Sequence, residues 1–382
     1  MVRINGDNVI TSLGFSTVEN INQINKDVCG ITLSEDKIFS QVPVYISIVD
    51  SLRLEEEFKN IPSDREYTRL EKFSILSIRD ALHKSTIDGS NKDTLIIFSS
   101  TKGNINLLDK NLAKRFEDHR IHLWSAANEV VKYFGNPNTP IIVSNACISG
   151  SLAILVGQRL INSGKFKNII ITGADIMSEF VISGFQSFQA ISEAPCKPFD
   201  IDRTGITIGE GAATIILSSD DSDEKKENRI RILGGGSSND ANHISGPSRS
   251  GDGLYYAINM ALKEAGISEK DIDYISAHGT GTGYNDEMEA KAIAWASLEE
   301  KPVNSYKGYV GHTLGAAGII ESIYASQSLL GNVLYPSMGF SKLGVSKELN
   351  IITDREQTPL QYCLKLASGF GGCNAAIVYE KT

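Results

Sequence analysis

The sequence predicts an α/β protein in which helices cover both faces of a parallel sheet and one plan is repeated in two halves. Two short β-branched runs, PIIVSNA at 140–146 and NIIITGA at 168–174, are typical of buried strands. Between them, SGSLAILVGQRL at 149–160 has apolar residues at helical spacing. A strand–helix–strand unit of this length requires parallel strands with helices packed on the sheet. The second half of the chain alternates strands and helices in the same way.

The other expected elements divide between the two halves. In the first half we expect a helix at 67–83, a strand at 94–100 and a helix at 111–134. In the second half we expect strands from Arg229 and at 273–277, 302–305, 363–367 and 375–379, with helices at 253–265, 286–298 and 315–330. The charged stretch SDDSDEKKENR at 219–229 reads equally well as a connection between two domains, 1–225 and 226–382, or as a surface loop.

Length and composition exclude several classes of protein. The chain has 382 residues, more than one small core needs, and its formal net charge of −9 argues against nucleic acid as a partner. No apolar stretch approaches the roughly 20 residues that span a bilayer, and the N-terminus lacks the pattern of a signal peptide. We therefore expect a cytoplasmic protein without a membrane partner. The five cysteines have irregular spacings and no CxxC, so we expect neither disulfides nor a metal site.

Cys147 is the first candidate for chemistry because it lies where a buried strand ends and a helix begins, in SNACISGS. A helix N-terminus offers unpaired N–H groups and a positive dipole end, and both favour a thiolate. The small neighbours Ser149, Gly150 and Ser151 leave room for a substrate. Taken alone, a cysteine in this setting is more often a packed core residue.

His278 ends an expected strand in AHGTGTGYNDEMEA. Its glycines suggest a dinucleotide-binding loop, but Tyr284 stands where the last glycine of GxGxxG belongs. A loop packed tightly around a functional histidine fits the segment better. A lone histidine is otherwise more often a structural side chain.

Lys307 and His312 occur in NSYKGYVGHTLGAAGIIES, where closely spaced glycines allow the backbone to approach a ligand. His312 lies at a loop-to-helix junction, which offers a side chain together with backbone N–H donors. Lys307 on its own reads as a surface charge. The C-terminal ASGFGGCNAAIVYE surrounds Phe370 with glycines ahead of a strand, which indicates either a strained loop facing a ligand or a plain tight turn.

In combination these motifs resemble the β-ketoacyl-acyl-carrier-protein synthases of the thiolase superfamily, in the elongating Cys-His-His group. The family's landmarks occur in order: NACISGS around Cys147, KPFDIDRTGITIGEGAA at 197–213, AHGTGTGYNDEMEAKAI at 277–293, NSYKGYVGHTLGAAG at 304–318 and GFGGCNAAIV at 369–378. The resemblance covers the chain from about Thr94 to the C-terminus. It implies a thiolase-like αβαβα fold of five layers, with two similar halves and an active site between them.

The resemblance also implies an activity, the decarboxylative condensation of an acyl group with a malonyl thioester, and a role for each matching residue. Cys147 carries the acyl chain, and His278 and His312 contact the malonyl thioester. The backbone N–H groups of Cys147 and Phe370 form an oxyanion hole, and Phe370 gates the nucleophile. Lys307 matches the family's active-site lysine and is counted with the catalytic residues. The supporting residues are its expected partner Glu289 and Thr280, Thr282 and Asn374.

Three positions depart from the family pattern. Ser368 replaces a phenylalanine commonly found two places before the gate, which predicts a looser gate. Lys102, in SSTKGN, falls near an acyl-pocket position that is normally apolar, and a charge there would shorten the pocket or make it polar. The N-terminal VRINGDNVITSLG lacks the usual apolar strand ending in TGxG.

The partners implied by the resemblance are an acyl carrier protein, which brings its own phosphopantetheine, and a second subunit. A homodimer is expected, and a heterodimer with a related chain remains open. Carrier proteins of this family are acidic, so an acidic synthase needs a local basic patch, and our candidates are Arg65, Arg69, Lys72 and Arg203. No other cofactor is expected, and the sequence leaves open whether a monovalent cation of the kind that supports some relatives is bound.

Four other functions compete with fatty-acid-type elongation. The departures at Ser368 and Lys102 also suit a ketosynthase of a specialised polyketide or polyene pathway. A non-catalytic chain-length subunit is disfavoured because such subunits typically lack the nucleophile. A degradative thiolase needs a second cysteine as base, for which Cys373 is the candidate. A cysteine hydrolase leaves the second histidine, the lysine and the glycine loops unexplained.

Overall fold

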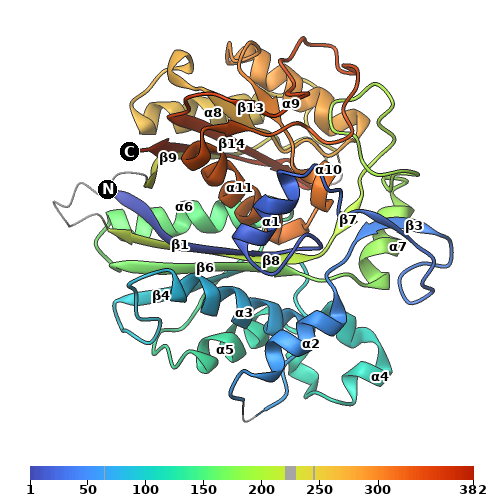
Figure 1. Ribbon diagram of the computed structural model, residues 1–382, viewed down its shortest axis with the longest axis vertical. Coiled ribbons are helices and arrows are strands. Elements are labelled where there is room, and N and C mark those ends of the chain that lie inside the picture. Colours follow the sequence, from blue (N-terminus) through green and yellow to red (C-terminus); the bar gives the residue numbers. More distant parts are fainter. Residues whose placement is uncertain (64, 220–228, 244–245) are drawn as a thin grey trace.

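The computed structural model describes residues 1–63, 65–219, 229–243 and 246–382, and it arranges them in five layers: helix, sheet, helix, sheet, helix (Figure 1). The two sheet layers come from the two halves of the chain, as the sequence predicts. The boundary expected between residues 225 and 226 lies outside the described residues.

Each sheet layer has five strands in the described part of the chain. The first contains β1 (Val2–Ile10), β4 (Thr94–Ser99), β5 (Ile141–Val143), β6 (Asn168–Asp175) and β8 (Gly211–Ser219), in the order β5-β4-β6-β8-β1. The second contains β9 (Ile230–Asn239), β10 (Tyr274–Ser276), β11 (Val303–Asn304), β14 (Tyr362–Gly369) and β15 (Cys373–Lys381), in the order β11-β10-β14-β15-β9.

The two sheets repeat one topology. In each, the three strands at the outer end are parallel, and the last two strands of the order pair antiparallel. Val2 and Arg3 of β1 pair with Ile232 and Arg231 of β9, so the ten described strands form one continuous sheet through this narrow junction. The duplication expected from the alternation of elements is thus present in strand order and direction.

Helices form the other three layers (Figure 1). The outer face of the first sheet is covered by α3 (Arg69–His83) and α5 (Leu123–Tyr133), and that of the second by α8 (Asp252–Ala265) and α9 (Gly283–Trp295). Between the sheets lie α6 (Ser149–Asn162) and α11 (Ala317–Gly331), which contact each other and both sheets. Both faces of each sheet are therefore buried, which explains why the strands read as continuous apolar runs.

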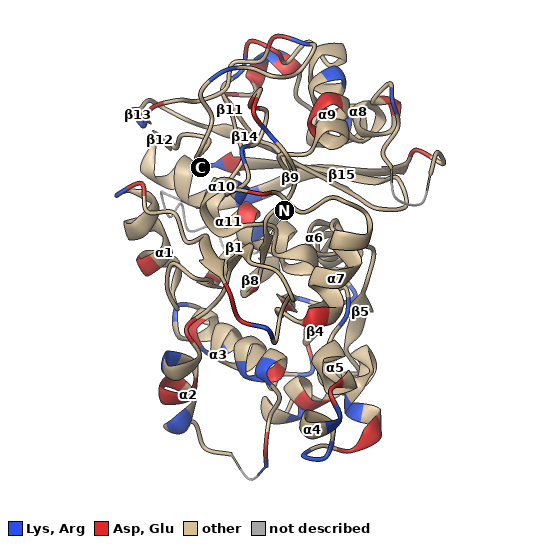
Figure 2. Cartoon of the chain, turned by 90° about the vertical axis from the view of Figure 1, so that its right-hand side faces the viewer, with Lys and Arg blue, Asp and Glu red and all other residues tan. Residues whose placement is uncertain are grey.

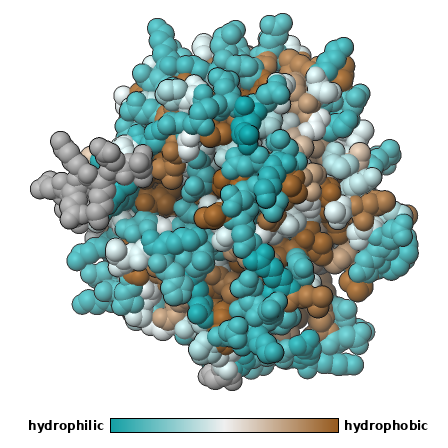
Figure 3. All heavy atoms as spheres, viewed as in Figure 1, coloured by the Kyte–Doolittle hydropathy of each residue, from teal (hydrophilic) through white to brown (hydrophobic). Residues whose placement is uncertain are grey.

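The remaining elements are shorter and lie around this stack: α1 (Thr17–Ile24), β2 (Thr32–Ser34), β3 (Val44–Ser47), α2 (Ser51–Lys59), η1 (Ile105–Leu108), α4 (Lys110–Ala113), η2 (Asp118–Ile121), α7 (Glu179–Ser187), β7 (Ile208–Gly209), η3 (Glu269–Asp271), α10 (Lys307–Val310), η4 (Leu314–Ala316), β12 (Val333–Leu334) and β13 (Glu356–Gln357). Within the described residues, no helix is both long and apolar enough to cross a membrane. The face seen in Figure 3 is mostly hydrophilic, with apolar patches towards the side where Figure 1 places α7 and β3.

One local expectation is wrong, and two strands were not foreseen. The single helix expected at 111–134 is broken into α4, η2 and α5, because Arg120 of η2 turns inward to form a buried ion pair with Glu71 of α3. The N-terminal segment that departs from the family pattern nevertheless forms β1, which pairs along its length with β8. Neither β1 nor β8 is among the strands expected from the sequence.

The middle layer depends on two glycines at the helix crossing. A Cβ added at Gly150 of α6 would lie 2.8 Å from the backbone nitrogen of Ile319, and one at Gly318 of α11 would lie 2.3 Å from that of Ser151. Side chains are excluded at such distances, so only glycine lets the two helix N-termini approach this closely. Cys147 precedes one of these helices and His312 precedes the other.

We predict that Gly318→Ala lowers the free energy of unfolding by about 1–3 kcal/mol, the usual cost of overpacking. Urea unfolding at fixed protein concentration measures the change. Gly184→Ala in α7 is the matched control, because a Cβ there meets nothing within 4 Å. That control is expected to be neutral or stabilising by up to about 1 kcal/mol. Equal midpoints for the two variants would contradict the crossing argument.

Candidate active site

The nucleophile candidate stands on a tight turn between β5 and α6. Ala146 has φ +44°, in the left-handed region that costs a non-glycine residue roughly 1 kcal/mol or more. The Ser149 hydroxyl stabilises this turn, since it accepts from the Asn145 N–H at 2.8 Å and donates to the Ala146 carbonyl at 2.6 Å. Cys147 follows directly and its side chain is only 8% exposed.

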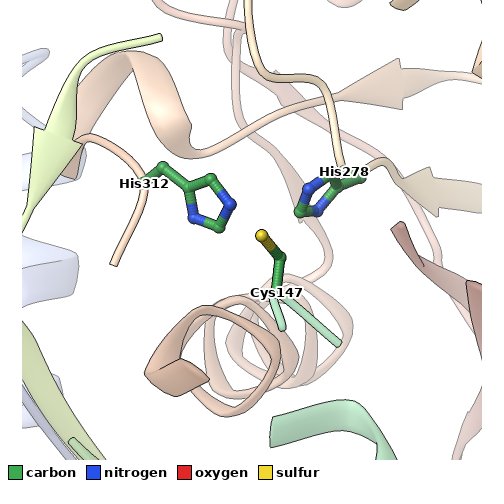
Figure 4. Close-up of side chains that lie close together, drawn as sticks. All are labelled: Cys147, His278 and His312. Atoms are coloured by element: carbon green, nitrogen blue, oxygen red, sulfur yellow. The ribbon is translucent and has the colours of Figure 1, made fainter. Parts of the chain in front are cut away.

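Two histidines from the second half face this sulfur. His278 follows β10 and His312 precedes η4, and their ring centroids are 5.1 Å apart with nearly perpendicular planes. One ligand-type atom from each of Cys147, His278 and His312 lies within 4.8 Å of the others. Figure 4 shows the sulfur between the two rings. The three residues that the sequence selects from distant motifs are therefore brought together.

The hydrogen bonds of the two imidazole rings determine which ring nitrogen carries the proton. His312 Nδ1 accepts the backbone N–H of Leu314 at 3.1 Å, and His278 Nδ1 lies 3.1 Å from the Lys307 ammonium, which can only donate. In a neutral ring the proton then sits on Nε2. His312 Nε2 is buried and has no hydrogen-bond partner among the described residues. Each histidine can thus present an N–H donor to a reacting oxygen.

Lys307 belongs to a buried charge network, and its partner there differs from the one predicted from the sequence. Its ammonium contacts Glu321 of α11 at 2.5 Å, so Glu289 is not its partner. The other oxygen of Glu321 lies 2.7 Å from the ammonium of Lys365 in β14. The side chains of both lysines are fully buried and that of Glu321 is 3% exposed.

Glu289 instead shapes the loop that carries His278. Its two oxygens accept the backbone N–H groups of His278 at 2.6 Å and Gly279 at 2.8 Å. Burial raises the pKa of Glu289 to about 7. Next to it, buried Asp286 accepts the N–H groups of Thr280 and Gly281.

Thr280 and Thr282 lie in the loop that carries His278, and their hydroxyl groups stabilise it, as the motif predicts. Their hydroxyls lie 2.9 Å apart, and the Thr282 hydroxyl caps the N-terminus of α9 by accepting the Asn285 N–H. Together with Glu289 and Asp286 they hold the glycine-rich loop around the histidine.

Burial and positive charge set the protonation of the three central groups. Burial is the largest cause that lowers the pKa of His278 and of His312, and the ammonium of Lys307 lowers both further. Both rings are therefore neutral at neutral pH. Burial also raises the pKa of the Cys147 thiol, although Lys307 and the backbone N–H of Phe370 oppose this. This direction is opposite to the one expected from the helix N-terminus, because desolvation outweighs the favourable charges.

Cys, His and His also form a ligand set that zinc accepts, but this arrangement does not suit a metal. Ligation needs an unprotonated ring nitrogen, whereas Nδ1 of each ring accepts a hydrogen bond and Nε2 carries the proton. The neighbouring lysine charges add a repulsive field for a cation.

A pocket of about 520 Å³ leads to the sulfur. Phe370, 37% exposed, stands in its wall, with its ring 5.7 Å from that of Phe185 and 5.6 Å from that of Phe188. The Ser368 hydroxyl donates to Asn374 at 2.8 Å, and Asn374 donates to Asp240 at 2.8 Å. The serine that replaces a phenylalanine is therefore a hydrogen-bonding part of the wall.

Among the predicted site residues, eight line the pocket: Cys147, His278, Thr280, Thr282, His312, Ser368, Phe370 and Asn374. Lys307 and Glu289 lie behind the histidines. Lys102 does not line this pocket, but its charge acts on Cys147, His312 and Asp175. Buried Asp175 accepts the backbone N–H groups of Thr101 at 3.0 Å and Gly315 at 2.7 Å, and so joins the Lys102 loop to the turn after His312.

None of the four proposed carrier-protein contacts lines the pocket, and three of them are ion-paired within the chain. Arg69 is ion-paired with buried Glu210, Lys72 with Glu55 and Arg65 with Glu129. Arg203 donates to the backbone carbonyls of Thr282, Asp200 and Gly344. Figure 2 shows positive and negative residues interleaved on α2, α3 and around α4. Arg69 and Arg203 therefore have internal partners that a charge reversal would break.

Four residues of the site were missed: Glu321, Lys365, Asp286 and Asp175. A signal existed for the first two, because each is a charge inside an apolar run, GIIESIYA and YCLKLAS. Their pairing depends on helix α11 lying against β14, which local sequence does not reveal.

Comparison with known proteins places this geometry in a family. The model of the beta-ketoacyl synthase N-terminal domain matches residues 19–222, and that of the C-terminal domain matches residues 230–341. The chain belongs to the β-ketoacyl synthase family.

Among curated relatives, the chain is 31% identical over 259 residues to a 3-oxoacyl-[acyl-carrier-protein] synthase 2 of Rhizobium meliloti, an alignment covering 64% of this chain and 61% of the relative. It is 32% identical over 248 residues to the enzyme of that name from Staphylococcus aureus, covering 62% and 60%. Both alignments span less than two thirds of the relative's length.

A solved structure is similar over the whole chain. It is the complex of the ketosynthase ApeO with its chain length factor ApeC from Xenorhabdus doucetiae, with a TM-score of 0.87 and 27% identity over 100% of this chain and 98% of the matched chain. The five-layered thiolase-like fold is therefore confirmed.

We predict that alkylation of Cys147 by iodoacetamide accelerates about tenfold per pH unit through pH 8 to 9, because the raised thiol pKa keeps the thiolate scarce. Lys307→Met should slow the reaction at each pH, since the lysine charge favours the thiolate. Mass spectrometry of the modified peptide reports the rate.

Cys147→Ala gives the background from the other cysteines, and Lys263→Met, an exposed position on α8, is the matched control for charge removal. A rate that is flat between pH 7 and 9 would show that the thiol is already ionised.

Proposed function

We propose that the chain is a β-ketoacyl-acyl-carrier-protein synthase that condenses a Cys147-bound acyl group with malonyl-carrier protein, as in fatty-acid elongation. The observation that carries the proposal is the pair of neutral histidines, each with Nδ1 occupied, on either side of a buried cysteine sulfur. The family membership and the names of the curated relatives support it.

In the first step, the Cys147 sulfur attacks the thioester of an acyl-carrier protein. The acyl carbon–sulfur bond to the carrier breaks, and the cysteine proton leaves with the phosphopantetheine thiol. The backbone N–H of Phe370, which faces the sulfur, and that of Cys147 stabilise the oxyanion formed at the carbonyl.

In the second step, malonyl-carrier protein loses CO2, and its thioester carbonyl becomes an enolate. The Nε2–H groups of His278 and His312 donate to the enolate oxygen. Neutral donors suit this role because they stabilise the charge without protonating the carbanion.

In the third step, the enolate carbon attacks the acyl-Cys147 carbonyl, and the carbon–sulfur bond to Cys147 breaks. The 3-oxoacyl-carrier protein departs, and the cysteine thiolate recovers a proton from solvent. The 520 Å³ pocket offers room for a phosphopantetheine arm and a short acyl chain, and Phe370 lines its wall, as expected of a gate.

A second subunit is part of the proposal. Strand β5 ends the sheet order, so one edge has no strand partner in the described chain, and such an edge favours pairing with another chain. A homodimer through β5 follows from the family resemblance, whereas the ApeO–ApeC complex supports a heterodimer with a related chain. Sedimentation equilibrium of the purified protein distinguishes a dimer from a monomer that awaits its partner.

Two competing functions can be weighed on specific contacts. A specialised polyketide or polyene ketosynthase is favoured by Ser368, whose bond to Asn374 gives the wall a polar character, and by the likeness to the ApeO–ApeC complex. A thiolase is disfavoured, because burial raises the pKa of Cys373 to about 12 and its thiol bonds to the Phe370 carbonyl at 3.3 Å. Product analysis with acyl primers of different lengths distinguishes a specialised polyketide or polyene ketosynthase from a fatty-acid elongation enzyme. The cytoplasmic location stays a prediction.

We predict that the wild-type protein releases CO2 from malonyl-carrier protein and condenses it with an acyl primer. Cys147→Ala should keep the release of CO2 and lose condensation, because the histidines act without the nucleophile. His312→Ala should lower CO2 release about 100- to 1,000-fold, the usual effect of removing one oxyanion donor. Radiolabelled CO2 and mass spectrometry of the carrier protein give the two readouts.

The matched control is His83→Ala, an exposed histidine at the end of α3, which should leave both activities unchanged. If the wild type released no CO2 from any carrier protein, alone or with a related subunit, the condensing function would be excluded.

A further inference from the structure

Lys365 is a charged residue in the middle of a buried strand. Alternation along β14 directs Leu364 and Leu366 to the outer helical layer, where they join the core with α8 and α9. Lys365 therefore points the other way, towards the middle layer, and its side chain is fully buried. An unpaired ammonium there would be very costly, so its partners decide its role.

Those partners link Lys365 to the histidine. Its ammonium donates to the Leu366 carbonyl and lies 2.7 Å from one oxygen of Glu321. The other oxygen of Glu321 is 2.5 Å from Lys307, which in turn contacts Nδ1 of His278 at 3.1 Å and the His278 carbonyl at 2.5 Å. The three N–H bonds of Lys307 are thereby used, and its contact with the ring depends on where Glu321 stands.

The carboxylate oxygens around the site already have partners within the chain, so few of them are available to bind a monovalent cation. Glu321 is shared by two ammonium groups, and Glu289 accepts two backbone N–H groups. Asp286 and Asp175, also buried, are occupied by backbone and hydroxyl donors. All four carboxylates thus accept from groups of the chain, and Glu321 also has two ammonium groups beside it.

We propose that Lys365 is a positioning residue that serves as a built-in cation: it holds Glu321 between two ammonium groups and so fixes Lys307 on the ring of His278. Condensation by the wild-type protein therefore needs no added monovalent cation. The inference rests on the proposed function for its kinetic test, but the position of the charge can be tested without activity.

Without Lys365, Glu321 is free to turn both oxygens towards Lys307 and draw it from His278. The loss also removes a positive charge that disfavours the imidazolium form of both histidines. The pKa of each ring then rises, and the acid limb of the pH profile for CO2 release moves to higher pH.

The test is Lys365→Ala, assayed with and without methylammonium, a cation that fits the vacated space. We expect kcat to fall about 10- to 100-fold, as for other residues that orient a catalytic histidine, with the KM for malonyl-carrier protein unchanged. Methylammonium should restore kcat and raise the melting temperature of this variant, and should do neither to the wild type.

Ile377→Ala is the matched control, because Ile377 of β15 is the cross-strand neighbour of Lys365 and its loss opens a cavity without removing charge. Methylammonium should not affect this variant. An unchanged kcat in Lys365→Ala, or equal rescue of both variants, would overturn the proposal.

A second measurement does not need a variant. Wild-type activity in a buffer whose only cation is tetramethylammonium should equal that in potassium or sodium, and a loss that potassium restores would refute the built-in cation. If the wild type lacks condensing activity, the proposed function fails, while the melting-temperature test of Lys365→Ala still decides the role of the charge.

Discussion

The site depends on how closely α6 and α11 approach each other in the middle layer. The two helices come from different halves, and Gly150 and Gly318 remove the side chains that would separate their N-termini. Cys147 precedes one N-terminus and the His312 turn precedes the other, so the crossing brings the nucleophile and the oxyanion donor together. A duplicated fold thus becomes a single active site at the seam where its halves touch.

The second determinant is the placement of charged side chains in the buried region behind the histidines. Burial alone would leave the histidines neutral, and the Lys307–Glu321–Lys365 network reinforces this while it directs Nδ1 of His278. The same burial holds the cysteine as a thiol. Neutral donors and a thiol whose proton leaves with the carrier thiol form a consistent set for acyl transfer followed by enolate chemistry.

Local sequence patterns predicted the two halves and the central residues, whereas the five layers followed from the family resemblance and strands β1 and β8 were not foreseen. Strand–helix alternation predicted the two halves, and the motifs around Cys147, His278 and His312 predicted three side chains that the structure brings together. Side-chain contacts between segments that are far apart in the sequence could not be predicted from these local patterns. Glu289 was predicted as the partner of Lys307 because the motif spacing gives no indication of Glu321. The helix expected at 111–134 is interrupted at η2, where Arg120 forms an ion pair with Glu71. The carrier-protein residues stay a prediction, because a list of arginines does not show which of them, like Arg69, are already ion-paired inside the fold.

The fixed tautomers of the two rings have a consequence for the lifetime of the acyl-enzyme. A histidine that holds its proton on Nε2 cannot accept a proton from water through the same atom, and Nδ1 is blocked by Lys307 in one ring and by the Leu314 N–H in the other. Neither ring can therefore act as a general base toward water beside the Cys147 thioester, so hydrolysis of that thioester would receive no general-base assistance from the two histidines. Under the proposed function, the acyl-enzyme would be spared histidine-assisted hydrolysis until a malonyl unit arrives, so a scarce extender would slow synthesis without discarding the growing product.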